Sequence, residues 1–312
     1  MNSYQAIYTE TNNCLDCYKC IRQCPVKAIK ISNNCASVID ELCIVCGKCV
    51  EICPVGVKKV RSDIQVVKLM IRKGKKLILS LAPSWVSCFP QYDSSTMVHT
   101  LQQLGFENVS ETALGAELVN RSIRQELKVS NSGVLISSAC PVVVEYIRRY
   151  KPELTDMIIP LVSPMLAHAS YLKNYYGPDA HVVFAGPCIA KKREADSWRQ
   201  LVSASITFNE LESWIQESTV NTEAPPEEPC LFEPVEAVSG SLYPIDGGLI
   251  ASLSTPETQN THFMSFSGME AVDSILKGVS GWKPTENVFI ELLSCTGGCI
   301  NGPAIPKKSS SL

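Results

Sequence analysis

The sequence predicts two parts of different architecture, a small α+β domain followed by a larger α/β domain in two lobes. Two short and closely similar cysteine-rich repeats occupy the first 60 residues. From Lys76 onward, apolar runs typical of buried strands alternate with stretches of helical periodicity. Such alternation is typical of layered α/β folds with parallel strands. We therefore expect one domain over residues 1–62, a connector over 63–76 and a two-lobed domain over 77–312.

Length, composition and charge narrow the class of protein. The 312 residues are 45% hydrophobic, which is enough for at least one large core. The formal net charge of -3 and the lack of a long basic run give no indication of nucleic-acid binding. No apolar run reaches the roughly 18 residues that cross a bilayer, and the N-terminus does not resemble a signal peptide. Fifteen cysteines therefore favour metal ligands in the reducing cytoplasm over disulfides, with neither nucleic acid nor membrane as a partner.

The first 60 residues carry a duplicated cysteine motif. Cys-x2-Cys-x2-Cys-x3-Cys-Pro runs from Cys14 to Pro25 and again from Cys43 to Pro54. This is the bacterial ferredoxin spacing, in which the fourth cysteine of each motif binds the other 4Fe-4S cluster. The expected ligand sets are Cys14, Cys17, Cys20 and Cys53 for one cubane, and Cys43, Cys46, Cys49 and Cys24 for the other. A zinc module is the alternative, but eight cysteines with both prolines favour a ferredoxin-like α+β domain, with short strands at 28–31 and 37–39.

Apolar patterning assigns the remaining elements. A helix is expected at 63–72 in the connector, and the basic residues beyond it are expected at a solvated surface. Strands are expected at 77–82, 134–136, 182–185, 263–266 and 288–293. Helices are expected at 94–104, 110–128, 141–150, 163–175, 189–201, 208–215 and 269–278. The acidic, proline-rich stretch 218–235 is expected to form a surface loop.

Four further cysteines follow expected strands of the larger domain. Cys140 follows 134–136, Cys188 follows 182–185, and Cys295 and Cys299 follow 288–293. Ligands of parallel α/β sheets collect at the carboxyl ends of strands, and thiolates select iron–sulfur clusters, zinc or copper(I). We expect these four thiolates to meet around a 4Fe-4S cluster between the two lobes. The alternative is that Cys140 and Cys188 are ordinary buried thiols, since free cysteine is among the most buried residue types.

The sequences around these cysteines resemble the three signature motifs of iron-only (FeFe) hydrogenases. They are Ser-Ser-Ala-Cys-Pro at 137–141, Gly-Pro-Cys-Ile-Ala-Lys-Lys at 186–192 and Glu-Leu-Leu-Ser-Cys-Thr-Gly-Gly-Cys at 291–299. In that family they read Thr-Ser-Cys-Cys-Pro, Met-Pro-Cys-x-x-Lys-x-x-Glu and Glu-x-Met-x-Cys-x-x-Gly-Cys. The resemblance covers nearly the whole chain, because the family commonly carries an N-terminal double-cubane domain. It implies a two-lobed domain that binds the H-cluster, which is a 4Fe-4S cubane bridged to a diiron subsite. It also implies hydrogenase activity with dihydrogen and protons as substrates, and an electron relay through the two cubanes of the N-terminal domain.

The resemblance also implies roles for individual residues. Cys140, Cys188, Cys295 and Cys299 would bind the cubane of the H-cluster, and Cys299 would bridge to a diiron subsite with carbonyl, cyanide and dithiolate ligands. Lys191 would donate to a cyanide, which needs a buried cation facing an anionic ligand. The residues expected to line the diiron pocket are Pro83, Ser84, Ser138, Gly186, Pro187 and Leu293, with Ser84 and Ala139 at catalytic positions beside Lys191.

Several positions depart from the family pattern. Ala139 stands where active members place a proton-relaying cysteine, and it has no exchangeable side-chain proton. Gly186 and Leu293 stand where methionines usually flank the diiron unit, and the glutamate-rich relay stretch reads Arg-Ser-Ile-Arg-Gln-Glu at 121–126. General acid–base help contributes roughly 10²–10⁴-fold, so turnover is expected to be slow. This combination resembles the sensory branch of the family, which implies a redox or signalling protein as partner.

Two other functions are compatible with the sequence. Hydrogenase-like assembly factors keep the cysteines without a diiron site and act as cluster carriers, and a plain multi-cluster electron carrier is a third interpretation. Glu291 is expected either to orient its loop or to lie at the surface as a plain carboxylate. The four histidines, His99, His168, His181 and His262, show no metal-ligand spacing. Three cysteines without patterned companions are expected to have packing roles, namely Cys35, Cys88 and Cys230.

Overall fold

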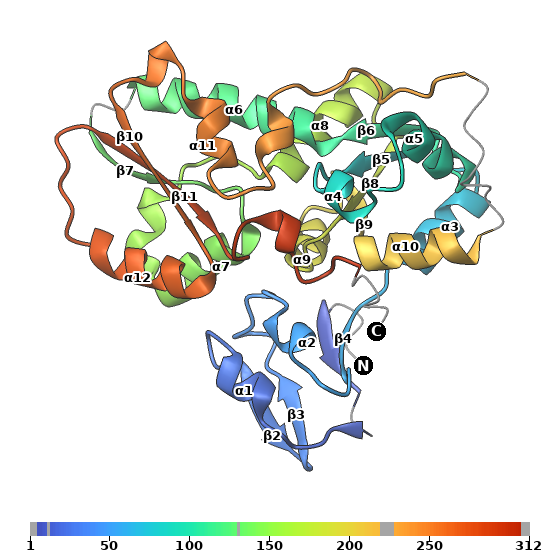
Figure 1. Ribbon diagram of the computed structural model, residues 1–312, viewed down its shortest axis with the longest axis horizontal. Helices are drawn as coiled ribbons and strands as arrows, with labels where there is room; N and C mark the ends of the chain where they lie inside the picture. The colour runs from blue at the N-terminus through green and yellow to red at the C-terminus, as the bar shows by residue number, and fades with distance from the viewer. Residues whose placement is uncertain (1–4, 11–12, 130–131, 219–227, 307–312) are drawn as a thin grey trace.

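A computed structural model describes residues 5–10, 13–129, 132–218 and 228–306 of the chain. A small N-terminal domain lies below a larger body, and that body has two lobes side by side (Figure 1). The small domain contains only short strands and helices, whereas each lobe is built on a parallel sheet. The predicted fold class, a ferredoxin-like α+β domain followed by a two-lobed α/β domain, is confirmed. Among the described residues, no helix combines the length and apolarity that a bilayer span requires.

The N-terminal domain consists of two antiparallel strand pairs and two short helices. The predicted hairpin is present as β2 (Ile29–Ser32) paired with β3 (Cys35–Val38). Four elements were not predicted, namely β1 (Ile7–Thr9), its partner β4 (Lys58–Val60), α1 (Lys19–Gln23) and α2 (Lys48–Glu51). Gly47 precedes α2 with a φ of 80°, and a Cβ added there would lie 2.5 Å from Pro303 Cβ. The small domain therefore packs closely against the end of the larger one.

The first lobe contains a four-stranded parallel sheet in the order β6-β5-β8-β9. Its strands are β5 (Leu77–Leu81), β6 (Asn108–Glu111), β8 (His181–Gly186) and β9 (Val202–Thr207). Its helices are α3 (Ile64–Arg72), α4 (Trp85–Cys88), α5 (Ser94–Gln103), α8 (Pro164–Tyr176), α9 (Ala190–Ser197) and α10 (Phe208–Glu217). Cys88 and Cys230 pack against the core of this lobe, and α3 contributes Ile64 and Val67 to it.

Two predicted helix boundaries next to strands of this lobe were wrong. The helix expected at 110–128 begins at Thr112, because the preceding residues pair with β5 as β6. The helix expected at 189–201 ends at Ser197, because the chain turns there to enter β9. Of the expected acidic loop at 218–235, residues 219–227 lie outside the described part of the chain, and 228–235 form no helix or strand.

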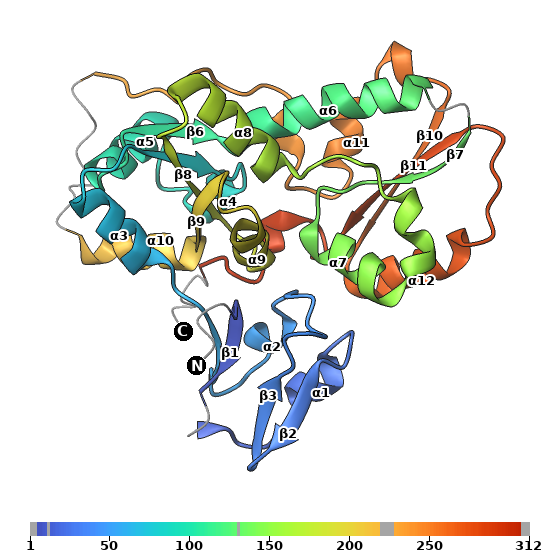
Figure 2. The same cartoon turned by 180° about the vertical axis from the view of Figure 1, so that it is seen from behind.

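The second lobe contains a three-stranded parallel sheet in the order β10-β11-β7. Its strands are β7 (Gly133–Ile136), β10 (Thr261–Ser267) and β11 (Asn287–Leu293). Its helices are α6 (Thr112–Val129), α7 (Pro141–Tyr150), α11 (Gly248–Leu253) and α12 (Met269–Val279). Helix α6 runs along the upper edge of the molecule and packs on α8, so it ties the two lobes together (Figure 2).

Candidate metal centre

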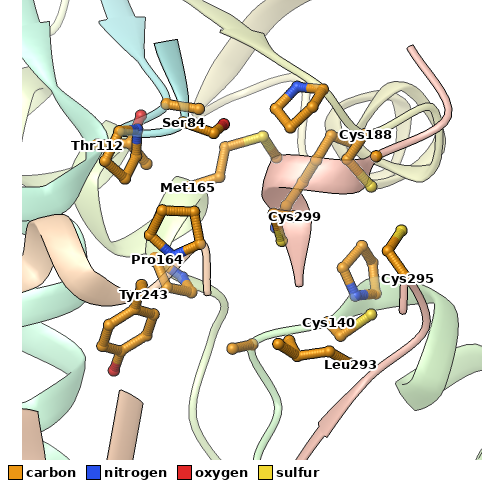
Figure 3. A pocket seen from close by; sticks show the side chains of 18 of the residues that line it. Ser84, Thr112, Cys140, Pro164, Met165, Cys188, Tyr243, Leu293, Cys295 and Cys299 are labelled. Atoms are coloured by element: carbon orange, nitrogen blue, oxygen red, sulfur yellow. The ribbon is translucent and has the colours of Figure 1, made fainter. Parts of the chain in front are cut away.

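A cavity of about 110 Å³ lies between the two lobes, where strands of both sheets end. Its lining follows β5 (Pro83 and Ser84), β7 (Ala139 and Cys140), β8 (Pro187 and Cys188) and β11 (Leu293 and Cys295), and it includes Cys299 and Lys191. The four cysteines lie on one side of this cavity, and Ser84, Thr112 and Tyr243 lie on the other (Figure 3). Chain segments more than 150 positions apart therefore contribute thiols to one space, as the strand-end argument predicts.

The thiols around the cavity lie in a dry environment. Burial, with a smaller contribution from the neighbouring Cys140, raises the pKa of Cys188 to about 11. Burial also raises the pKa of Cys295 and of Cys299 well above the usual range, and the nearby thiols add to this effect through mutual repulsion. Without a metal these thiols hold their protons at neutral pH. Coordination to a metal removes those protons, so the site suits a cationic iron core better than free thiolates.

The loop between Cys295 and Cys299 depends on glycine. Gly297 and Gly298 adopt φ values of 76° and 102°, which side chains rarely tolerate. A Cβ on Gly298 would also lie 2.3 Å from the carbonyl oxygen of Pro244. The two glycines let the chain turn sharply, so that both cysteines of this loop face one cavity.

Lys191 brings a positive charge to the wall of the cavity. Its Nζ donates to Glu194 Oε2 at 2.6 Å and to Ser163 Oγ at 2.9 Å, and Ser163 Oγ donates to the same carboxylate at 3.0 Å. A lysine ammonium has three N–H donors, and these contacts use two of them. One donor therefore remains for an anionic ligand held inside the cavity.

The other walls are mostly apolar, with one unpaired hydroxyl. Met165, Phe184, Leu249 and Leu293 line the cavity with apolar side chains. Ser84 is 2% exposed, and its Oγ has no hydrogen-bond partner among the described residues. Buried hydroxyl groups are nearly always hydrogen-bonded. Four thiols, a cation with a spare donor and an orphaned hydroxyl around a dry space therefore fit a cofactor that carries both iron and polar ligands.

Glu291 is buried at the base of the cavity. It is 1% exposed, so the expectation of a surface carboxylate was wrong. The backbone N–H groups of Leu249 and Ile250 donate to its carboxylate at 3.4 and 3.5 Å, which ties β11 to α11. Burial raises the pKa of Glu291 to about 7, although these hydrogen bonds oppose the shift. The group therefore titrates near neutral pH.

The cysteines of the N-terminal domain line two further small cavities, each of about 20 Å³. The first is lined by the outer set, which we define as Cys14, Cys17, Cys20 and Cys53. The second is lined by the inner set, which we define as Cys24, Cys43, Cys46 and Cys49. Each motif thus places its fourth cysteine with the other motif's first three. The inner set lies nearer the large cavity, because Cys24 and Cys46 share a cleft with Cys295.

Among the described residues, no three His, Cys, Asp or Glu side chains are arranged to hold a single metal ion. A 4Fe-4S cubane binds its four thiolates through four different iron atoms. Its ligands therefore stand farther apart than those of a zinc ion, which gathers all four around one centre.

Comparison with known proteins identifies the family. The family model described as "Iron only hydrogenase large subunit, C-terminal domain" matches residues 75–303, and a "4Fe-4S dicluster domain" matches residues 6–54. The chain belongs to the iron-only hydrogenase family. Iron hydrogenase 1 of Clostridium pasteurianum is 24% identical to it over 290 residues, which cover 74% of this chain and 50% of that protein. The NADP-reducing hydrogenase subunit HndD of Solidesulfovibrio fructosivorans is 23% identical over 304 residues, which cover 78% of this chain and 52% of that one.

Solved structures of this family share the fold. A variant of [FeFe]-hydrogenase HydA1 from Chlamydomonas reinhardtii superimposes with a TM-score of 0.65 and 19% identity, covering 80% of this chain and 86% of that one. At this identity the likeness concerns the fold alone. The chain spans about half the length of the curated relatives it matches.

Sequence reasoning missed several residues of this hydrogenase-family site. Glu194 occupies the last position of the family's Met-Pro-Cys-x-x-Lys-x-x-Glu motif, so the motif itself was a signal for it. Thr112, Met165 and Tyr243 line the cavity from segments without any motif. Of the other predicted pocket residues, Ser138 lines a neighbouring cleft. A Cβ added to Gly186 would lie 2.6 Å from Phe184 Cζ and 3.0 Å from Ala82 Cβ, and both of these residues line the cavity.

Proposed function

We propose that the chain binds an H-cluster in the cavity between its lobes and catalyses the reversible cleavage of dihydrogen into protons and electrons. The observation that carries this proposal is the convergence of four cysteines and Lys191 on one dry cavity. Cys140, Cys188, Cys295 and Cys299 would hold the cubane of the cluster. When bound, the diiron subsite with its carbonyl, cyanide and dithiolate ligands supplies the metal at which dihydrogen is split.

The side chains of the cavity have distinct tasks in this proposal. The spare N–H of Lys191 and the hydroxyl of Ser84 bind the polar ligands of the subsite, and each gains a hydrogen bond that the protein alone does not provide. Apolar side chains such as Met165 and Phe184 keep water out and strengthen these contacts. Ala139, which lines the same cavity, offers no proton to relay.

The outer and inner cysteine sets would each hold a 4Fe-4S cubane. The inner cubane would lie nearer the large cavity than the outer one, because Cys24 and Cys46 of the inner set share a cleft with Cys295. Cys17 of the outer set is exposed, so a redox or signalling protein can approach the outer cubane there. Electrons would pass from the cavity through the inner cubane to the outer one and on to that partner. The many thiolate ligands suit the reducing cytoplasm.

We further propose that turnover is slow and serves a sensory purpose. The support is Ala139, whose methyl group lies at the cavity in the position of the family's relaying cysteine. A missing general acid–base group slows a reaction by roughly 10²–10⁴-fold. A slow enzyme still binds dihydrogen and passes on its electrons, which is sufficient for a sensor.

Infrared spectroscopy after anaerobic assembly of the diiron subsite tests the proposal. The expected result is a set of carbonyl and cyanide stretching bands that shift under dihydrogen. Lys191→Met should lose or broaden the cyanide bands while its visible iron–sulfur absorption stays at the wild-type level. Absence of these bands in the wild-type protein, with its cubanes intact, would exclude the H-cluster.

A cluster carrier without a diiron site is the second candidate. The observation that favours it is the combination of Ala139, Gly186 and Leu293, which removes the side chains that usually surround the diiron unit. Iron content separates the two functions. Both contain three cubanes, and the diiron subsite of an H-cluster adds about two iron atoms to them. A carrier would also transfer a cubane to an apo-ferredoxin, whereas the proposed hydrogenase would retain it.

A further inference from the structure

Lys58 is a buried cation in the N-terminal domain. It lies on β4 opposite Thr9 of β1, and only 2% of it is exposed. Its Nζ donates to Thr9 Oγ1 at 2.7 Å and to the carbonyl oxygen of Ala36. No carboxylate of the described residues lies within 4.0 Å of this ammonium group. Buried charges are ordinarily paired, so the position requires a counter-charge that the neighbouring side chains do not supply.

The outer cysteine set lies next to this charge. Lys58 lines the same small cavity as all four of its cysteines. The uncompensated ammonium group therefore faces the place where an anionic cluster with four thiolate ligands is expected.

The charge of Lys58 also reaches Cys49 of the inner set, but Lys58 does not line the inner cavity, and the cations close to that set are paired with carboxylates. Arg193 donates to the carbonyl oxygen of Cys43, but its guanidinium lies 2.6 Å from the carboxylate of Asp40. Lys48 lines the inner cavity and is paired with Glu51 at 3.3 Å. Both cations near the inner set are thus compensated by carboxylates, whereas Lys58 is not.

We propose that Lys58 provides the counter-charge of the outer cubane and raises its reduction potential above that of the inner cubane. Reduction adds a negative charge to the cluster, and a buried positive charge nearby stabilises that reduced form because solvent screens it poorly. Net charge, hydrogen bonds and burial are the factors that set cubane potentials. This inference rests on the proposed function, because the two cubanes of this domain are part of that proposal.

The consequence is a direction for the electron relay. Electrons released in the cavity pass first to the inner cubane and then to the outer one, where the higher potential retains them. Cys17 of the outer set is exposed, so the electron is held at the point where a redox partner can collect it. This arrangement favours oxidation of dihydrogen with delivery of electrons outward.

The test is a redox titration of the assembled full chain, monitored by electron paramagnetic resonance. Lys58→Met should lower the midpoint potential of the outer cubane. At the wild-type midpoint, the ratio of oxidised to reduced outer cubane should rise about tenfold, which corresponds to about 59 mV for one electron. Lys58→Gln, which keeps hydrogen-bond donors for Thr9 and Ala36, should shift the potential in the same direction and covers a failure of Lys58→Met to assemble.

Lys59→Met is the matched control. Lys59 is the next residue on β4, its side chain is 44% exposed, and it lies 3.8 Å from Glu10. The variant removes the same formal charge from solvent and should leave both potentials unchanged. Three results would overturn the role of Lys58 without affecting the proposed function. They are an unchanged outer potential in the Lys58 variants, an equal shift in Lys59→Met, or loss of the outer cubane in both Lys58 variants. A wild-type chain that lacks two ferredoxin-type cubanes would instead reject the cofactor set proposed above.

Discussion

Lys191 Nζ and Glu194 Oε2 form a 2.6 Å ion pair at the wall of the cavity, where their side chains are only 10% and 15% exposed. The two residues are three positions apart on α9, so the helix itself holds them together. Ser163 from the turn before α8 donates to the same carboxylate. Three side chains from two segments therefore fix the ammonium group next to the cysteines.

Glu194→Gln should destabilise the protein by about 3 kcal/mol, because it leaves a largely buried ammonium group without its counter-charge. Anaerobic urea unfolding measures this difference. The control is Glu51→Gln, which breaks the Lys48–Glu51 pair at the same spacing with both side chains at least one-third exposed. Exposed pairs contribute about 1 kcal/mol or less, so similar losses in the two variants would contradict a special role for the pair at the cavity.

Much of this site follows from sequence because its ligands are fixed by backbone geometry. Cys140, Cys188 and Cys295 each follow a parallel strand within four residues, and parallel strands end at a common edge. What local patterns do not specify is which strands share a sheet, with β7 and β11 in one sheet and β8 in the other. That arrangement depends on α6 bridging the lobes, which a local pattern does not encode.

The two strands missed in the first lobe, β6 and β9, are the edges of its sheet. Strand β6 has a single large apolar residue, Val109, so it carries no strand pattern in the sequence. The hydroxyl of its buried Ser110 is satisfied, because it lies 3.0 Å from Nε2 of His168 on α8. Strand β9 reads Val-Ser-Ala-Ser-Ile-Thr, an apolar–polar alternation that was itself a signal for a strand, and it pairs with β8.

Ala139→Cys should raise the rate of dihydrogen oxidation by at least about tenfold, because it places a proton-exchanging thiol at the cavity. The gain should stay below the full effect of a relay, since the stretch 121–126 contains only one acid. The measurement is dihydrogen uptake with an artificial electron acceptor, together with exchange of dihydrogen against deuterated water. Ala116→Cys places a thiol elsewhere on the same cavity wall. Equal acceleration in this control would show that position does not matter.

Glu291 predicts a pH dependence of stability. Its folded-state pKa of about 7 lies above the ordinary value of 4.5, so between these values the folded protein holds a proton that the unfolded chain loses. Stability should therefore fall as pH rises through this window, by about 3 kcal/mol in total, and level off above pH 7. Urea midpoints of wild type and Glu291→Gln between about pH 5.5 and pH 8 measure the effect. The neutral variant should lose this part of the slope, and parallel curves would refute the assignment.

Gly298→Ala should prevent the loop from presenting Cys295 and Cys299 to one cluster. The position requires a φ of 102°, and the new methyl group would lie 2.3 Å from the carbonyl oxygen of Pro244. Backbone strain of this kind costs about 1–3 kcal/mol, and relief of the clash would displace the loop. We expect lower stability and, in protein without an assembled diiron subsite, loss of about four iron atoms, the content of one cubane.

Gly278→Ala provides the matched control for this loop. Gly278 lies in α12 without a positive φ, and an added Cβ there meets no atom within 4 Å. Alanine is the better helix former by about 1 kcal/mol, so this variant should be slightly more stable and keep its full iron content. Iron analysis and urea unfolding of the two variants side by side separate a general effect of replacing glycine from a requirement of the cysteine loop. Retention of all iron in Gly298→Ala would show that the backbone geometry at Gly298 is not needed for the cluster.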